Sequence, residues 1–411
     1  MPSPHYSINS SNGRHEANPM RVTLVGAFPP QAKGEAHYLG EFATALRRSN
    51  RIELSIVSQY RDKPSIDRWN GFEVRRDFFD RSLRPSFGRH DELLNAVVRT
   101  RPDMVHVHYG PNQDYGGRLG ESLVYVLRSL RNRGIKVVLT LHSLWLPRDV
   151  LDSPPAQRLP SFARFLVPKY FGWLMRSMRR NCDEFACLVS ASNSPMTTEF
   201  ARAYGVEGVL EEVHGCRPRF SEIPGFPPVV LSFGFLRPDK GFEYLIDAFG
   251  RYVSVGGSGR LLIVGRPQTA GDAPYAQYLQ RKASEILDGR CTVEARFCSD
   301  EELESFLHES SLIVLPYLRN VGASGPLHHA LGVGRPIITT NVGHNRALAG
   351  ITQLVEPASA ETLAESLSAM LRDRASLLAA TNGIRAEAAQ RSWDRLADRY
   401  VTRYFNMRAK G

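Results

Sequence analysis

Hydrophobic positions along the chain form short apolar runs that alternate with helix-like segments. Between residues 37 and 48, for example, Leu39, Phe42 and Leu46 recur at the spacing of one helix face. The apolar runs are rich in β-branched residues, and strands are therefore expected at 20–28, 52–58, 103–110, 135–143, 184–192 and 209–216. Strands that alternate with helices indicate a parallel α/β domain.

The alternation breaks at residues 217–228 and then starts again. Three of the last five residues of this stretch are Pro and another is Gly, which favours a linker. Beyond it, apolar runs suited to strands buried on both faces occur at 229–236, 260–266, 291–297, 311–317 and 336–340. A helical pattern at 392–405 ends the chain.

These patterns predict two doubly wound parallel-sheet domains, 20–216 and 229–390, joined by the linker 217–228. Residues 1–19 are polar and rich in Ser, Asn and Pro, so a disordered tail is expected there. Residues 391–411 hold the closing helix. Two such domains that face each other direct the carboxyl ends of their strands into a central cleft, where open α/β sheets bind ligands.

Composition is typical of soluble globular proteins and points to an anionic partner. The 411 residues are 42% hydrophobic and 23% charged, with a net charge of +10 and no apolar run long enough to span a membrane. Nucleic acid, a nucleotide diphosphate or an anionic membrane face would each suit this charge, as would a generally basic surface without a specific partner. The five cysteines lack metal-ligand spacing, which favours structural thiols in a reducing cytosol.

The first candidate site is the segment 234–249, GFLRPDKGFEYLIDAF. A strand is expected to end at Gly234, a loop with Arg237 and Lys240 follows, and an amphipathic helix begins near Gly241. Two cations beside a helix N-terminus suit a pyrophosphate, because backbone N–H groups and the helix dipole favour anions there. A solvated turn with ordinary charges is the alternative.

The second candidate site is the segment 320–340, in which VGASG follows an expected strand and opens a helix. Gly322 and Gly325 would let the backbone approach a ligand, and Ser324 with the loop N–H groups could cradle phosphate oxygens. The strand–turn–helix context makes this turn more informative than a glycine-rich sequence alone.

Together these segments resemble the donor-binding domain of the family 4 glycosyltransferases. In that family a Gly-Arg-Leu…Lys-Gly loop follows the first strand, and a later segment carries two glutamates separated by seven residues, then Ala and Gly-x-Pro. GFLRPDKG matches the loop, and ASGPLHHALGVGRPIITT matches the later segment. FPPQAKGEAHYLGEFATAL, DMVHVHYG, VVLTLHSLW and SWDRLADRYVTRYF are similar to further landmarks of the family, in the same order.

The resemblance implies a GT-B fold, in which two Rossmann-like domains face a central cleft and the closing helix returns to the N-terminal domain. It also implies an NDP-sugar donor and retention of anomeric configuration. Gly34 and Glu35 stand where the family's first loop approaches the donor phosphate, although Glu35 is equally explained as a helix N-terminal carboxylate. His142 stands where a family histidine lines the donor sugar.

The chain also departs from the family. Phe235 replaces the arginine after the strand glycine, and Val321 and His329 replace the paired glutamates, which contact the donor sugar and the nucleotide ribose. Val321 has no polar side chain, so sugar contacts would fall to the backbone of 322–324. His329 can still bond a ribose hydroxyl, since imidazole offers both donor and acceptor nitrogens.

The predicted site therefore combines two groups of residues. His142, Arg237 and Lys240 are predicted to be catalytic. The predicted donor-binding residues are Gly34, Glu35, Gly234, Gly322, Ala323, Ser324, Gly325 and His329. No metal or other cofactor is expected, because no DxD-type carboxylate pair accompanies the phosphate loops.

The expected partners are an NDP-sugar and a glycan or lipid-linked acceptor, in cell-envelope or exopolysaccharide synthesis. Nucleic acid is not expected, because no known binding motif accompanies the charge. Two alternatives are an NDP-sugar epimerase on the same fold and a catalytically degenerate relative that binds nucleotide or glycan.

Two further features each have two explanations. His106 and His108 share a strand face, which suggests metal, yet they lack a third ligand at suitable spacing and core or cleft lining is favoured. The segment 159–181 mixes aromatic and basic residues, which suits an interfacial helix on anionic lipid. Alternatively its aromatic residues pack on the sheet and its basic residues face water. The expected location is the cytoplasm, with the inner face of the membrane as a peripheral contact.

Overall fold

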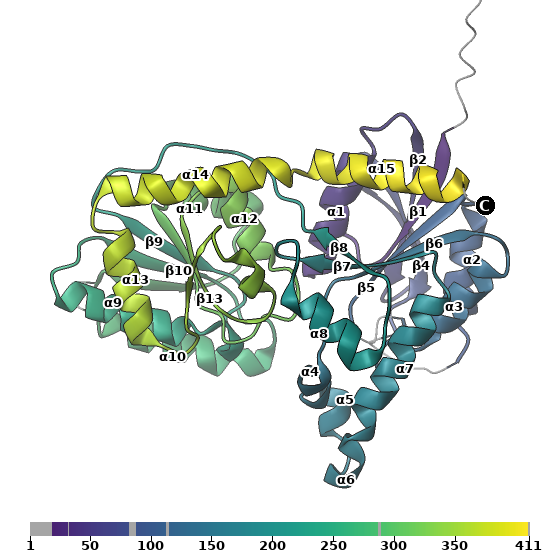
Figure 1. Cartoon of the computed structure of the whole chain (residues 1–411), viewed down its shortest axis with the longest axis horizontal. Helices are drawn as coiled ribbons and strands as arrows, with labels where there is room; N and C mark the ends of the chain where they lie inside the picture. The colour runs from purple at the N-terminus through teal and green to yellow at the C-terminus, as the bar shows by residue number, and fades with distance from the viewer. Residues whose placement is uncertain (1–18, 32, 82–87, 112–114, 287–288, 410–411) are drawn as a thin grey trace, which may run out of the picture.

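The computed structural model describes residues 19–31, 33–81, 88–111, 115–286 and 289–409. The expected disordered tail therefore lies almost entirely outside the described residues. Two α/β domains stand side by side, each with helices on both faces of a central sheet (Figure 1). The predicted fold class, two doubly wound parallel-sheet domains, is confirmed.

The N-terminal domain is built on an eight-stranded sheet of order β3-β4-β2-β1-β5-β6-β7-β8. Its strands are β1 (Met20–Val25), β2 (Ile52–Tyr60), β3 (Ser65–Trp69), β4 (Phe72–Phe79), β5 (Met104–Tyr109), β6 (Lys136–Leu141), β7 (Glu184–Val189) and β8 (Val209–Val213). Its helices are α1 (Gly34–Leu46), α2 (Asp91–Arg99), α3 (Ser122–Arg131), α4 (Pro147–Leu151), α5 (Pro154–Gln157), α6 (Ser161–Arg164), α7 (Leu166–Arg180) and α8 (Pro195–Tyr204). The central strands β1 and β5 are fully buried apart from Arg21, as expected for strands covered on both faces.

The strands β3 and β4 form a hairpin that the helix–strand alternation did not predict. They pair antiparallel at the edge of the sheet. Asn70 and Gly71 connect them with φ of 45° and 78°, which is the left-handed geometry of a tight hairpin turn. An Asn-Gly pair favours this turn, because both positions require positive φ.

The C-terminal domain has a six-stranded sheet of order β11-β10-β9-β12-β13-β14, and its neighbouring strands pair in parallel. The strands are β9 (Val229–Phe233), β10 (Arg260–Gly265), β11 (Cys291–Ala295), β12 (Leu312–Leu315), β13 (Ile337–Thr340) and β14 (Gln353–Val355). The helices are η1 (Pro238–Lys240), α9 (Phe242–Ser254), η2 (Ala270–Asp272), α10 (Ala273–Ser284), α11 (Asp300–Glu309), α12 (Gly325–Val333), η4 (Gly343–Leu348), α13 (Ala360–Met370) and α14 (Arg374–Gln390).

The chain crosses between the domains twice, and the two crossings lie against each other. The first follows Cys216, after which residues 217–228 form neither helix nor strand. The second lies between α14 and α15 (Trp393–Ala409). The Cys216 N–H donates to the Arg391 carbonyl at 2.9 Å, and the Trp393 N–H donates to the Cys216 carbonyl at 3.2 Å. A two-stranded connection therefore joins the domains.

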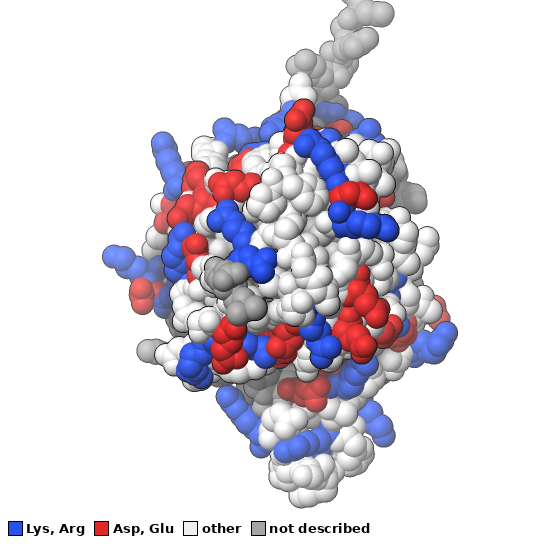
Figure 2. All heavy atoms as spheres, turned by 90° about the vertical axis from the view of Figure 1, so that its left-hand side faces the viewer, with Lys and Arg blue, Asp and Glu red and all other residues white. Residues whose placement is uncertain are grey.

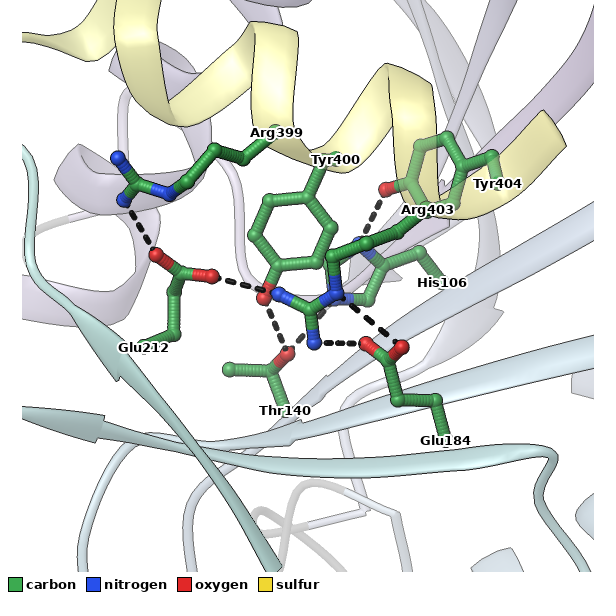
Figure 3. A network of polar contacts seen from close by, with 8 residues as sticks. All are labelled: His106, Thr140, Glu184, Glu212, Arg399, Tyr400, Arg403 and Tyr404. Carbon is green, nitrogen blue, oxygen red and sulfur yellow. Dashed lines mark hydrogen bonds and ion pairs between the residues drawn. The ribbon is translucent and has the colours of Figure 1, made fainter. Parts of the chain in front are cut away.

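The helix α15 packs on the N-terminal domain, where Tyr400 and Tyr404 are fully buried (Figures 1 and 3). His106 of β5 bonds the Tyr404 hydroxyl at 2.6 Å and the Thr140 hydroxyl at 2.8 Å. Both nitrogens of the His106 ring are thus used inside the protein, which agrees with the core interpretation of this histidine.

An ion-pair network next to these tyrosines ties α15 to the last two strands of the sheet (Figure 3). Arg403 bonds the carboxylates of Glu184 and Glu212, the latter at 2.6 Å, and Arg399 bonds Glu212 at 2.6 Å. Burial raises the pKa of Glu184 while Arg403 opposes the rise, so each buried carboxylate depends on its arginine.

We predict that Arg403→Ala lowers the free energy of unfolding by about 3–5 kcal/mol, because it leaves the Glu184 carboxylate without a cation and Glu212 with Arg399 alone. Urea unfolding followed by circular dichroism measures the change. Arg395→Ala, on the exposed side of the same helix, is the control and should change the free energy by about 0.5 kcal/mol or less. Equal effects of the two substitutions would contradict the importance of the network.

Candidate active site between the two domains

The loops that follow β6 and β12 meet directly across the domain boundary. The Leu144 N–H donates to the Val321 carbonyl at 2.7 Å, and Ser143 pairs with Gly322 in an antiparallel bridge. A Cβ on Gly322 would lie 2.6 Å from the His142 carbonyl oxygen. We call this contact of residues 142–144 with 321–322 the seam.

The seam changes the interpretation of Gly322. From the sequence, this glycine is expected to let the backbone approach a ligand, and the backbone of 322–324 is expected to contact the sugar. In the structure the close approach is to the backbone of His142, because the two loops pair with each other. Ala323 likewise crosses the boundary and packs against the hydrophobic core that contains β1 and α1. A sugar at this place would have to separate the loops.

The two predicted phosphate segments lie together in the C-terminal domain. Gly234, with φ of 134°, stands 3.5 Å from Pro326 in the first turn of α12, measured from the position of an added Cβ. The Lys240 ammonium lies 3.9 Å from the centre of the Tyr317 ring, and the Tyr317 hydroxyl is 2.8 Å from the Ser324 hydroxyl. The fold thus brings the loop after β9 against the start of α12.

The hydroxyl of Ser324 already has partners. It accepts a hydrogen bond from the Leu327 N–H at 3.3 Å and so caps α12, in addition to its bond with Tyr317. The backbone N–H groups at the start of the helix were predicted to bind phosphate together with Ser324, and they remain the second part of that prediction. Gly325 leaves space there, since an added Cβ would meet nothing within 4 Å.

Lys240 and Arg237 differ in how far their charges are compensated. The Arg237 guanidinium donates to Asp239 at 2.8 Å and also bonds Gln268. Lys240 is half-buried and makes no ion pair within 4 Å with a described carboxylate. Burial lowers the pKa of Lys240 to about 8, with Asp239 opposing and Arg237 reinforcing the shift. Lys240 is therefore the better placed cation for an anionic ligand.

His142 lies at the end of β6 with its side chain buried against the N-terminal domain. Its Nε2 bonds Nδ1 of His108 at 2.9 Å, and its ring contacts Tyr38 at 5.0 Å between centres. Burial holds the pKa of both histidines well below the usual value, so both imidazoles are neutral. The His142 ring is thus positioned by His108, a residue that the sequence analysis did not place in the site.

His329 of α12 faces His37 of α1 across the boundary, with ring centres 5.3 Å apart. Burial, together with His37 and Arg217, lowers the pKa of His329 to about 4. A neutral imidazole keeps one donor and one acceptor nitrogen, which is what a ribose hydroxyl requires. His37 was not predicted, although it lies one helical turn after Gly34 and so shares the face of α1 that meets the cleft.

The predicted loop residues at the start of α1 border open space. Gly34 is exposed, and a Cβ added there would meet nothing within 4 Å. Glu35 is half-buried, and its charge raises the pKa of Tyr109 beyond the effect of burial. His344, another histidine near the boundary, is buried and bonds the Ser194 hydroxyl at 3.2 Å.

Other candidate features lie away from this site. Within the described residues, no group of three or more His, Cys, Asp or Glu side chains could hold a metal ion, and no helix there is long and apolar enough to cross a membrane. A hollow of about 430 Å³ lies between the end of α9 and α13, lined by residues such as Arg251 and Glu361. It is at the opposite edge of the sheet from Lys240, because α9 begins beside that lysine.

Two doubly wound parallel-sheet domains whose loops meet at a central boundary are the architecture of the GT-B class of glycosyltransferases. The chain is a glycosyltransferase made of two domains of known glycosyltransferase families. Residues 32–214 match the model described as Glycosyltransferase Family 4, and residues 227–373 match the model described as Glycosyl transferases group 1.

Two relatives are named as glycosyltransferases. The lipopolysaccharide 1,2-N-acetylglucosaminetransferase of Salmonella typhimurium is 25% identical over 179 residues, 42% of this chain and 46% of the relative, so the match spans about half of that protein. The GDP-mannose:glycolipid 4-beta-D-mannosyltransferase of Xanthomonas campestris is 26% identical over 330 residues, 77% of this chain and 83% of the relative.

Solved structures share the fold over nearly the whole chain. Sucrose-phosphate synthase from Thermosynechococcus elongatus matches with a TM-score of 0.69 at 18% identity, covering 95% of this chain and 100% of that chain. Anabaena HepE in complex with UDP matches with a TM-score of 0.66 at 15% identity, covering 94% and 100%. At these identities the likeness defines the GT-B architecture.

We predict that Gly322→Ala opens the domain boundary, because the new Cβ would overlap the His142 carbonyl oxygen. Overpacking of this kind costs about 1–3 kcal/mol. Small-angle X-ray scattering should show a larger radius of gyration for this variant. Gly383→Ala in α14, where an added Cβ meets nothing within 4 Å, is the control. An unchanged radius of gyration for Gly322→Ala would show that the seam does not hold the domains together.

A second prediction concerns the charge of Lys240. Only the protonated amine attracts a diphosphate, and the pKa of Lys240 is lowered from 10.5 to about 8. The affinity for a nucleoside diphosphate should therefore fall as pH rises through 8, by up to about tenfold per pH unit. Isothermal titration calorimetry between neutral and alkaline pH measures this. Lys240→Arg should show a flatter profile, since a guanidinium stays charged; matching profiles would exclude Lys240 as the titrating group.

Proposed function

We propose that this glycosyltransferase moves a sugar from an NDP-sugar to a glycan or lipid-linked acceptor, with retention of configuration, in cell-envelope or exopolysaccharide synthesis. The observation that carries the proposal is the half-buried Lys240, which pairs with no carboxylate among the residues that the structure describes and lies beside the start of α12. The Salmonella relative is named for lipopolysaccharide and the Xanthomonas relative for a glycolipid acceptor, which supports the proposed acceptor class.

The chemistry required of this site is mainly electrostatic. In the transfer, the bond between the anomeric carbon and the diphosphate oxygen breaks, a bond to the acceptor hydroxyl oxygen forms, and the hydroxyl proton passes to an oxygen of the departing diphosphate. Negative charge grows on the departing diphosphate. Lys240 and the N–H groups at the start of α12 would stabilise that charge, and Arg237 would add to the positive field from its place beside Asp239.

Recognition of the nucleotide would fall to His329. This residue stands where the family has its ribose-binding glutamate, and its neutral ring can both donate and accept a hydrogen bond. His142 would line the sugar from the opposite domain, with its ring orientation held by His108. The proposed location is the cytoplasm, with contact at the inner face of the membrane.

A catalytically degenerate binding protein is the second candidate. The observation that favours it is the seam, because Val321 and Gly322 are occupied by backbone contacts to residues 143–144 exactly where sugar contacts were expected. Such a protein would bind a nucleotide and transfer nothing. An NDP-sugar epimerase would need an acid–base pair at the sugar; burial holds the pKa of His108 and of His142 well below the usual value, which disfavours the protonated form that a general acid requires.

We predict that one of UDP, GDP and ADP raises the melting temperature of the protein, because a ligand that binds only the folded state stabilises it by mass action. Lys240→Ala should remove this stabilisation and lower the rate of sugar transfer by about 10²–10³-fold. Lys63→Ala, an exposed lysine on the N-terminal domain, is the matched control and should behave as the wild type.

The outcomes separate the candidates. Stabilisation by a nucleotide with no transfer from any NDP-sugar would favour the degenerate binding protein. No stabilisation by any of the three nucleotides, or full transfer by Lys240→Ala, would reject the proposed phosphate site.

A further inference from the structure

Helices α6 and α7 carry an apolar surface that faces solvent. Phe162 is 80% exposed, Phe165 58%, Leu166 51%, Tyr170 41% and Trp173 48%. These positions recur at the spacing of one helix face, and we call the set the aromatic face.

The other side of α7 is apolar too. It packs in the core of the N-terminal domain through Val167, Phe171, Leu174, Met175 and Met178. A helix with one buried face is expected to be polar on its solvent side. Of the two explanations for the segment 159–181, packing of the aromatics on the sheet therefore holds for Phe171 but not for Phe162, Phe165, Tyr170 or Trp173.

The segment that carries the aromatic face has charges of one sign, although Glu121, just before α3, accepts a hydrogen bond from the Tyr170 hydroxyl at 3.1 Å. Residues 153–182 contain six Lys and Arg and no Asp or Glu. Arg176 and Arg179 bond backbone carbonyls of the neighbouring helix end, at Tyr204 and Glu207. They belong to the packing of the domain.

The cations nearest the aromatic face are differently placed. Arg164 donates to the backbone carbonyls of Leu159 and Gln157, and Lys169 lies 5.6 Å from the centre of the Phe165 ring. Arg158 is exposed. None of the three lies within 4 Å of a carboxylate oxygen of a described residue, so their charge is available to an anionic partner.

The surface view agrees with this distribution. At the lower tip of the molecule, where α6 lies in Figure 1, Figure 2 shows white surface bordered by blue Lys and Arg side chains. On the face of the C-terminal domain in the same view, red and blue side chains are interspersed. Blue side chains thus predominate around the tip, with red side chains at its upper margin.

The aromatic face is connected to the candidate active site. The chain runs from His142 through Trp145 into α4, and the Trp145 ring stacks on Phe171 of α7 with centres 6.4 Å apart. Asp149 of α4 pairs with Arg319 of the C-terminal domain at 2.8 Å. A surface bound by α6 and α7 would therefore lie on the side of the molecule to which the cleft loops lead.

We propose that the aromatic face docks on an anionic phospholipid surface, with Arg158, Arg164 and Lys169 against the headgroups. Trp, Tyr and Phe rings suit the boundary between headgroups and acyl chains, and nearby cations add attraction to anionic lipid. Docking in this orientation would present a lipid-linked acceptor to the cleft, a consequence that rests on the proposed function. The docking itself needs no donor and no transfer.

Vesicle flotation without any sugar nucleotide tests the docking. The wild type should bind vesicles that contain phosphatidylglycerol, bind vesicles of phosphatidylcholine alone less, and lose binding as salt rises. The double variant Phe162→Ser/Phe165→Ser should bind about tenfold less or weaker still. Arg158→Glu/Lys169→Glu should lose about fivefold per cation removed, and with it the preference for phosphatidylglycerol.

Matched controls come from the C-terminal domain. Val255 is 78% exposed and Arg372 has a side chain that is 73% exposed, so Val255→Ser and Arg372→Glu remove an equally exposed apolar group and cation elsewhere. Both controls should bind vesicles as the wild type does. Circular dichroism and thermal melts verify that all variants are folded.

Failure of the wild type to float with anionic vesicles, or wild-type binding by both double variants, would overturn the proposal. So would a concentration-dependent dimer that Phe162→Ser/Phe165→Ser abolishes, since a second copy would then cover the face. Transfer to a water-soluble acceptor reports on the proposed function separately. Normal vesicle binding with no transfer would reject the enzyme and keep the docking, and the reverse result would reject the docking alone.

Discussion

The docking of α15 on the N-terminal sheet fixes the position of one domain relative to the other. Burying carboxylates is costly, and Glu184 and Glu212 are tolerated at this interface because Arg403 and Arg399 lie against them. The docked helix in turn holds the second crossing of the chain beside Cys216. Without it a single irregular linker would connect the domains, and the loops of the cleft would have no fixed partner.

Much of the fold could be predicted, because a strand covered by helices on both faces must be apolar along its whole length. The hairpin of β3 and β4 was not predicted, for the converse reason. β3 is the edge strand and has no buried residue, and β4 beside it mixes apolar residues with charged ones. β14 was also missed, since Gln353–Val355 is too short to show a period. In both cases a tertiary position, rather than a local preference, makes the segment a strand.

The candidate site was predictable where it depends on continuous sequence. The loop with Lys240 and the turn that opens α12 each consist of neighbouring residues, so their chemistry is visible in the chain. His37 and His108 come from α1 and β5 and reach the boundary only through the fold. The seam is harder still to predict, because it exists only when two separately folded domains approach. The ion pair of Arg237 lies between these cases. Its partner Asp239 stands only two residues away in the sequence, but the contact itself depends on how the loop folds.

The seam also has a thermodynamic consequence for any ligand that needs the place where the two loops meet. Such a ligand binds only the fraction of molecules in which the Leu144–Val321 pair is broken, and its apparent dissociation constant is the intrinsic one divided by that fraction. Small changes in loop pairing would then alter affinity without touching a ligand-binding group. The closed state thus competes with ligand binding. A donor that needs this place binds only if its binding free energy exceeds the free energy of the loop pairing.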